Sequence, residues 1–340
     1  MTAVVVSLLF AALKPEEMKG FLHLDYLGRK VLWPMGRAMF FMSLGLVAAM
    51  IIEALGWMVK VGRLAAPLTD FAHLPEVGAA SFTVALVSTP TANGMLSEAL
   101  DKGEISSRAL AVANLLNGSW PSFIVHLPTT LVVATSLAGK AGLAYTVIMF
   151  AAATLRLIGA AVLGRMILPP PAASALQPSE GQARKKTMKE IWPGLRKRLF
   201  NRLTSLISLA APIYYLVTLA AFMGFFAAVQ AFSTAHLPDF FLPVEAAALI
   251  IFSLTAEFSS GFVAAGAMID NLALTVPQAA AALIIGNILS TPIRALRWQL
   301  GPFLGFFKVR LGLILLGCNQ GFRVLSLIIA LFVFWRIFGG

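Results

Sequence analysis

Residues 77–100 read VGAASFTVALVSTPTANGMLSEAL, an apolar stretch with polar and helix-breaking residues at its centre, between Ser88 and Gly94. Gly, Pro, Ser and Asn favour turns over helix interiors. Residues 244–269 are apolar in the same way and are interrupted at Glu257-Phe258-Ser259-Ser260-Gly261. We predict that each stretch forms a hairpin of two short helices, and a single kinked helix is the alternative.

The composition places these stretches in a membrane protein. Of the 340 residues, 59% are apolar and only 12% are charged, and the mean hydropathy is +0.85. Soluble domains carry about 25% charged residues, which they need to cover their surface. The apolar runs are continuous rather than alternating, which favours helices over a membrane β-barrel. We therefore predict an all-α polytopic membrane protein and exclude a soluble enzyme and a disordered chain.

The net charge of +11 is unevenly distributed. Residues 168–202 form a polar segment rich in Lys and Arg, whereas residues 203–293 contain neither. Because positive charge concentrates in cytoplasmic loops, residues 168–202 are predicted to be a basic cytoplasmic linker in an inner-membrane protein. Lys140 and the loop at 270–275 are predicted to lie on the opposite side. This topology explains the basic balance, so we expect no nucleic-acid partner.

The chain divides into four predicted parts. Residues 1–37 are an amphipathic, interfacial N-terminal segment, residues 38–167 a first membrane repeat, residues 168–202 the linker and residues 203–340 a second membrane repeat. Each repeat has three spans and one re-entrant hairpin, which enters and leaves the membrane on one side. Three crossings per repeat make the two repeats inverted in topology. The predicted spans are 38–59, 106–137, 142–166, 203–229, 276–300 and 309–337.

Short motifs support an internal repeat, because they recur in the same order and at a nearly constant spacing along the chain. The pairs are Leu74-Pro75 and Leu242-Pro243, Asn93-Gly94 and Ser260-Gly261, Asn117 and Asn287, and Arg156 and Arg323. Inverted repeats with broken helices are typical of secondary transporters, whose sites lie near the bilayer midplane.

These motifs resemble those of the nucleoside-recognition or "gate" domain family of membrane proteins. The resemblance rests on the two broken stretches and on the segments that follow them, Asn117-Gly118-Ser119-Trp120-Pro121 and Asn287-Ile288-Leu289-Ser290-Thr291-Pro292. That family includes spore-maturation membrane proteins and the membrane part of bacterial ferrous-iron transporters, and it is similar in plan to concentrative nucleoside transporters. The resemblance covers about 40–166 and 205–337 and implies a transporter-like core. The chain has no GxxxxGK[ST] motif, which argues against a ferrous-iron pump.

Four arginines are the strongest candidates for a binding site. Arg156 and Arg323 fall in the middle of predicted spans, where a charge costs several kcal/mol unless it is paired or hydrated. They either contact a substrate or pair with one of the few acids, Glu53 and Glu257. Arg294 and Arg297 lie three residues apart on one helix face and suit a phosphate or carboxylate. The alternative is that both extend to the cytoplasmic interface.

Neutral polar residues complete the predicted substrate-binding set, which also contains Asn93, Asn117, Ser259, Ser260 and Asn287. The alternative role of these groups is to satisfy the backbone of the broken helices. Glu257 is predicted to bind H⁺ or Na⁺ as a coupling ion, or to cap a half-helix. The chain has no HExxH or GxSxG motif and no Cys/His cluster. We therefore expect neither an enzyme nor a metal site, and no cofactor beyond a coupling ion.

The leading functional hypothesis is a secondary transporter of an anionic small solute or a phosphate-bearing lipid headgroup. It would work by alternating access, with the hairpins meeting near the midplane. The alternatives are a nucleoside carrier and a non-transporting scaffold or accessory subunit with a degenerate gate domain. The expected partners are the lipid bilayer and the anion, and a homodimer is compatible with this plan by analogy.

Overall fold

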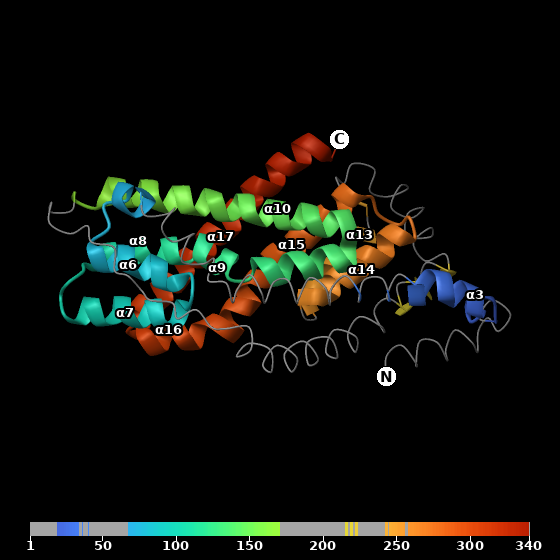
Figure 1. Ribbon diagram of the computed structural model, residues 1–340, viewed down its shortest axis with the longest axis horizontal. Helices are drawn as coiled ribbons and strands as arrows, with labels where there is room; N and C mark the ends of the chain where they lie inside the picture. The colour runs from blue at the N-terminus through green and yellow to red at the C-terminus, as the bar shows by residue number, and fades with distance from the viewer. Residues whose placement is uncertain are drawn as a thin grey trace, which may run out of the picture.

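The computed structural model describes residues 19–33, 67–170, 245–255 and 258–339, with a few isolated positions between them. Every regular element in these ranges is a helix (Figure 1), so the all-α prediction is confirmed for this part of the chain. Most of the predicted spans 38–59 and 203–229, most of the linker, and Glu53 and Glu257 lie outside the described residues.

Within the described ranges, three helices are long and apolar enough to cross a membrane, namely α10 (Leu127–Ile167), α15 (Val276–Arg294) and α17 (Val309–Phe338). The outward faces of α10 and α17 expose large apolar side chains such as Phe150, Ile158, Phe332 and Val333. Apolar faces of this kind are unfavourable in water and suit contact with lipid.

The remaining helices are shorter. They are α3 (Leu24–Leu27), η1 (Gly28–Leu32), α6 (Glu76–Ala85), α7 (Thr89–Asp101), α8 (Ser107–Asn117), α9 (Trp120–Ile124), α13 (Glu245–Thr255), α14 (Phe258–Asp270), η2 (Ala295–Gln299) and α16 (Leu300–Phe306). Helices α6 and α7 pack against each other, as do α13 and α14, so both predicted helical hairpins are present.

The break in the first hairpin lies earlier than the sequence suggested. Ser88 is the N-cap of α7, and its hydroxyl accepts a hydrogen bond from the Thr91 amide at 3.3 Å. Pro90 occupies the first turn, where a missing N–H has no cost. Asn93 and Gly94 therefore lie inside α7, and the break falls at residues 86–88.

The chain reverses at Gly139 within α10. This residue has φ +54° and ψ −125°, a conformation that favours glycine. The two arms of α10 lie side by side (Figure 1), so closely that a Cβ on Gly142 would overlap the Ala134 carbonyl. The predicted spans 106–137 and 142–166 are therefore separate, but the first consists of α8, α9 and the short first arm of α10.

The corresponding span of the second half is longer than predicted. Pro292 lies within α15, which continues through the π-helical turn η2 into α16 and ends at Phe306. Proline removes a helical hydrogen bond, and a local π-turn accommodates the bend without ending the helix. The predicted end at residue 300 is therefore too early, because the helical path continues to Phe306.

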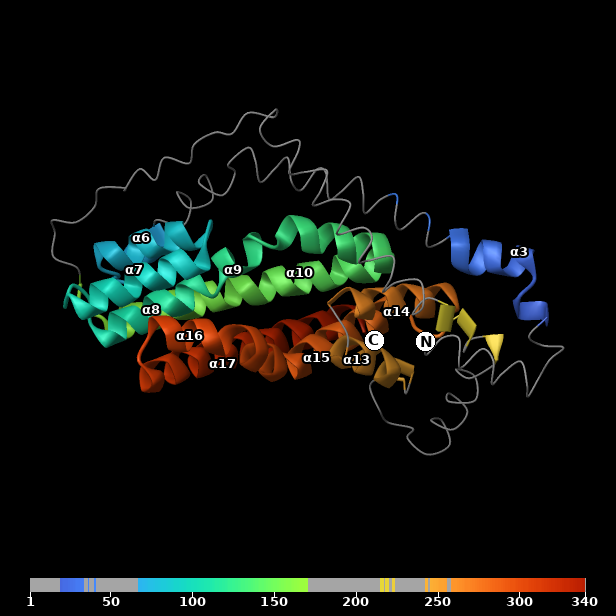
Figure 2. The ribbon, with the colours of Figure 1, turned by 90° about the horizontal axis from the view of Figure 1, so that it is seen from below.

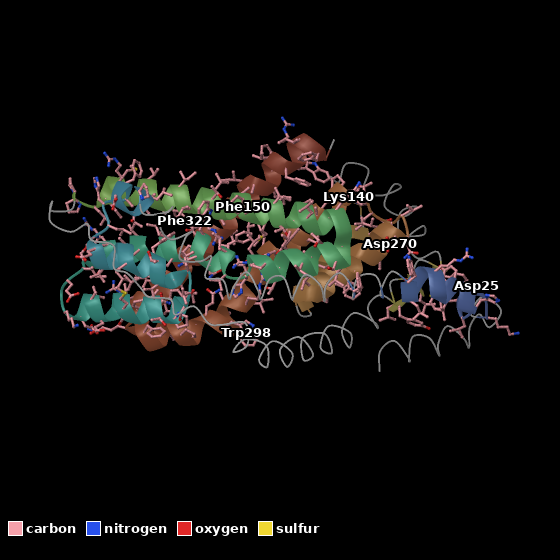
Figure 3. The ribbon with its side chains drawn as sticks, in the orientation of Figure 1. Asp25, Lys140, Phe150, Asp270, Trp298 and Phe322 are labelled. Carbon is pink, nitrogen blue, oxygen red and sulfur yellow. The ribbon has the colours of Figure 1, made fainter. Side chains whose placement is uncertain are left out.

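The two hairpins lie toward opposite ends of the helical body, and α10 runs from one to the other (Figures 1 and 2). We expected them to meet; instead the long helices separate them. The second arm of α10 and α17 run in opposite directions. Figure 3 places Lys140 and Asp270 toward the same end of the molecule.

Candidate functional site

The long helices carry buried polar side chains at the level where one apolar core ends and the other begins. One core surrounds α13, α14 and α15, and the other surrounds α6, α7 and α8. On α10, Arg156 lies between Ala153 of the first core and Leu157 of the second. Arg323 occupies the corresponding place on α17 and Asn287 on α15. We call Asn117, Arg156, Asn287, Arg294 and Arg323 the arginine layer.

Asn287 is the centre of this layer and is only 4% exposed. Its Oδ1 accepts hydrogen bonds from Arg294 at 2.7 Å and from Arg323 at 3.3 Å. Arg294 also donates to the Asn287 carbonyl at 2.9 Å. The Asn287 Nδ2 donates to the Tyr145 hydroxyl and, at 3.6 Å, to the Met149 sulfur. Asn287 therefore joins α10, α15 and α17.

Arg156 lies at the other side of the layer and is 7% exposed. One of its Nη atoms donates to the Gly118 carbonyl at 2.8 Å, at the C-terminal end of α8. The Nε atoms of Arg156 and Arg323 are buried and have no hydrogen-bond partner. The two guanidinium charges also repel each other.

The positive charge of the layer is not balanced within the described part of the chain. Arg156, Arg294 and Arg323 form no ion pair with a carboxylate there, and the ion pairs of that part, His23–Asp25 and Lys102–Glu98, are exposed. The acids predicted as partners, Glu53 and Glu257, lie outside the described residues. Buried charges are costly without a partner, so this layer is suited to receive negative charge.

The two ends of the Asn117 amide differ in their hydrogen bonding. Its Nδ2 donates to the Ser81 hydroxyl of α6 at 3.1 Å, whereas its buried Oδ1 has no partner. Asn117 is 1% exposed, and its neighbour Gly118 is held by Arg156. The first hairpin, α8 and α10 therefore meet at this point.

A chain of amides connects α7, α8 and α17 nearby. Asn114 donates to the Asn93 Oδ1 at 3.2 Å, and Asn319 donates to the Asn114 Oδ1 at 2.7 Å. A Cβ on Gly118 would overlap the Asn319 side chain, so this glycine leaves room for the amide. Asn93, predicted to bind substrate, is engaged here by the protein itself.

The other predicted residues are dispersed. The Ser260 hydroxyl donates to the Phe252 carbonyl at 3.0 Å and so joins α14 to α13, as the backbone-satisfying alternative proposed. The side chains of Ser259 and Arg297 lie outside the described residues. Within the described ranges, no group of three or more His, Cys, Asp or Glu residues gathers to hold a metal ion.

Sequence reasoning missed Asn114, Asn319, Tyr145 and Glu245. A usable signal existed for the two asparagines: Asn114 lies one turn before Asn117, and Asn319 one turn before Arg323, so each shares a helix face with a predicted residue. Glu245 is 4% exposed at the start of α13, with one carboxylate oxygen unpartnered.

Comparison with known proteins gives a relative without a functional assignment. The uncharacterized protein MJ0880 of Methanocaldococcus jannaschii is 24% identical over 303 residues, which cover 87% of this chain and 96% of the relative. No family model matches the chain. No solved structure matches it either. The similarity to the archaeal protein extends over both halves of the chain.

Proposed function

We propose that the protein is a secondary transporter that moves an anionic small solute, or a phosphate-bearing lipid headgroup, by alternating access. The observation that carries this proposal is the arginine layer, where Arg156, Arg294 and Arg323 gather without a carboxylate partner among the described residues. Guanidinium groups bind phosphate and carboxylate through paired hydrogen bonds. A bound anion would supply the missing negative charge, and we propose no catalytic role.

Matched helix boundaries support the two-repeat plan on which such a mechanism depends. Helices α6 and α13 begin at residues 76 and 245, α7 and α14 at 89 and 258, and α8 and α15 at 107 and 276. The separation along the chain is identical for all three pairs. The opposite directions of the second arm of α10 and of α17 (Figures 1 and 2) agree with inverted topology.

The turns after the hairpins support the same plan at the level of single hydrogen bonds. After α7, Gly103 has φ +73° and the Glu104 amide donates to the Ala99 carbonyl at 2.9 Å. After α14, Leu272 has φ +60° and the Ala273 amide donates to the Met268 carbonyl at 2.8 Å. These positions repeat with the same separation as the helix starts. Leucine is strained in this conformation, and a repeat that preserves the turn accounts for it.

The test is anion uptake by the full chain in proteoliposomes, together with anion-dependent thermal stabilisation of the purified protein. Sodium phosphate, sulfate and acetate serve as probes and chloride as the reference. We expect Arg323→Gln to lower uptake and stabilisation at least about tenfold, because a charged hydrogen bond is worth about 1.5–3 kcal/mol. Arg336→Gln is the matched control on the same helix, since Arg336 lies in the last turn of α17.

Two results would contradict the anion proposal. One is an absence of stabilisation by any of the anions, which would favour the scaffold alternative. The other is equal anion binding by Arg323→Gln, Arg156→Gln and Arg336→Gln.

A nucleoside carrier is the second candidate, favoured by the amide chain of Asn93, Asn114 and Asn319. It predicts that uridine stabilises the protein and that Asn319→Ala removes this effect. It also predicts that Arg323→Gln leaves the stabilisation by uridine unchanged.

A further inference from the structure

The orientation of the Asn117 amide is fixed by its neighbour. Ser81 donates its single hydroxyl hydrogen to the Gly78 carbonyl at 2.7 Å. The Ser81 oxygen is therefore left as an acceptor, and Asn117 must direct its Nδ2 toward it, at 3.1 Å. The Asn117 Oδ1 consequently faces away from Ser81, buried and without a partner. Within the arginine layer, the Asn117 Oδ1 is thus a hydrogen-bond acceptor of fixed orientation.

A charged donor reaches the backbone next to Asn117. Arg156 holds the carbonyl of Gly118, the residue that follows Asn117, and its own Nε is buried without a partner. A buried acceptor without a partner, the Asn117 Oδ1, and a buried cationic donor without a partner, the Arg156 Nε, therefore belong to residues that are linked through Gly118. Unfilled buried groups of this kind are costly, and a ligand that both donates and accepts would satisfy them together.

A water molecule would match the hydrogen bonds but not the charge. Arg156 and Arg323 also have no carboxylate partner among the described residues, and this favours an oxyanion as the ligand. A fully deprotonated oxyanion presents only acceptors, so one of its oxygens would face the Asn117 Oδ1 unfavourably. An oxyanion that keeps an O–H group donates to Asn117 and accepts from Arg156.

We infer that the layer selects an oxyanion bearing its own O–H group, namely hydrogen phosphate or a phosphomonoester that retains its proton, over sulfate. This inference rests on the proposed anion function and names the substrate class of the same site. Asn117 is then the specificity-determining residue, and Ser81 is a positioning residue that holds its amide. Asn287 cannot perform this role, because its Oδ1 already accepts from Arg294 and Arg323.

The test compares phosphate with sulfate on the purified full chain, at neutral pH and equal ionic strength, by titration calorimetry. Phosphate retains an O–H under these conditions and sulfate does not. An unmatched buried acceptor weakens binding about tenfold to a hundredfold, so we expect phosphate to bind more tightly by that factor. Equal affinity for the two anions would overturn the inference.

Ser81→Ala provides a result that a purely structural role would not give. Without Ser81, the Asn117 amide is free to rotate and to present Nδ2 to the anion. We expect sulfate to bind more tightly than in the wild type and the preference for phosphate to fall below about threefold. Ser253→Ala is the matched control, because the Ser253 hydroxyl donates to a carbonyl of its own helix at 2.9 Å, as that of Ser81 does. An unchanged preference in Ser81→Ala would contradict the role of Ser81.

The failures of the two proposals are distinguishable. If phosphate and sulfate bind equally and Arg156→Gln weakens both, the anion site stands and the selectivity does not. Mixed micelles with phosphatidic acid or sulfatide separate a lipid headgroup from a free anion. If the protein prefers phosphatidic acid to sulfatide but does not distinguish free phosphate from free sulfate, the ligand is a lipid headgroup. If it prefers free phosphate to free sulfate, the ligand is a solute. If no anion, free or lipid-borne, binds, both proposals fail.

Discussion

Asn117 and Asn287 lie on helices α8 and α15, which begin at matched positions of the two halves, yet their surroundings differ. The Oδ1 of Asn287 accepts from two guanidinium groups, whereas the Oδ1 of Asn117 accepts from none. Asn287 anchors the arginines of the second half. Asn117 is held only through its Nδ2, which donates to Ser81, so its Oδ1 remains an acceptor for a ligand.

The helix ends explain this difference. Helix α8 ends at Asn117, and Arg156 donates to the carbonyl of the residue that follows it, Gly118. Helix α15 continues past Asn287 to Arg294, which lies two turns later and reaches back to it. A shared backbone plan with one helix extended by two turns therefore gives two different polar environments.

The largest expected effect separates the two asparagines. Asn287→Ala would leave Arg294 and Arg323 without their shared acceptor and should lower the free energy of unfolding by about 3–5 kcal/mol. Asn117→Ala loses one neutral hydrogen bond, with Ser81, and should cost about 1 kcal/mol. Unfolding in mixed micelles measures both values. Equal costs would show that the two asparagines contribute alike to stability.

Asn287→Asp sharpens the same comparison. Its carboxylate would pair with Arg294 and Arg323, so we expect the ligand-free protein to melt at a higher temperature and phosphate to stabilise it less. Asn117→Asp, next to the residue that Arg156 holds, should act in the same direction but less strongly. A lower melting temperature for Asn287→Asp would count against the unbalanced charge of the layer.

Substitution of glycines in the long helices by alanine should have the next largest effect on the free energy of unfolding. In Gly142→Ala the new Cβ would overlap the backbone carbonyl of Ala134, with an expected cost of about 2–3 kcal/mol. In Gly312→Ala it would lie 2.9 Å from the Phe303 carbonyl, and we expect about 1 kcal/mol. Gly317→Ala, with open space around the Cβ, should be neutral or stabilising. The order of the three unfolding free energies is the check.

Asn319→Ala probes the amide chain, which has no described counterpart in the second half. The loss of its hydrogen bonds to Asn114 should cost about 1–2 kcal/mol. Gly118→Ala would displace the same side chain, so the double variant should cost little more than the larger single one. Additive costs would show that the two positions act independently.

The smallest expected effect concerns the N-caps of α8 and α15. The Ser106 hydroxyl accepts from the Ala109 amide at 3.2 Å, so Ser106→Ala should cost about 1 kcal/mol. At the matched cap, Gln278 accepts from the Thr275 amide at 2.9 Å and would still do so in Thr275→Ala. We therefore expect about 0.5 kcal/mol there. Thermal melts of the two variants test the order.

Most of the helix pattern was predictable because it depends on local composition. The described helices of both hairpins, the reversal near residue 139 and the last helix fall within a few residues of the predicted bounds. One error was the break assigned to the segment around Pro90, because proline is compatible with the first turn of a helix. The other was the end of the span predicted at 276–300, because the helix bends through a π-helical turn after Pro292 and continues.

The candidate site was less predictable. Arg156, Arg294, Arg323 and Asn287 were identified because charge and amide groups are conspicuous in apolar helices. Their partners were not, because a hydrogen bond between helices 36 to 142 residues apart in the sequence leaves no local signal. Asn93 and Ser260 looked equally suitable and are engaged by the protein.

The sequence by itself determined an all-helical chain with apolar helices, two hairpins and a few interior arginines, because hydropathy and turn-forming residues act over short distances. Only the tertiary structure decided that Asn287 receives two guanidinium groups while Asn117 keeps an unfilled acceptor. That difference depends on where two helices end and on which side chains meet across α8, α10, α15 and α17.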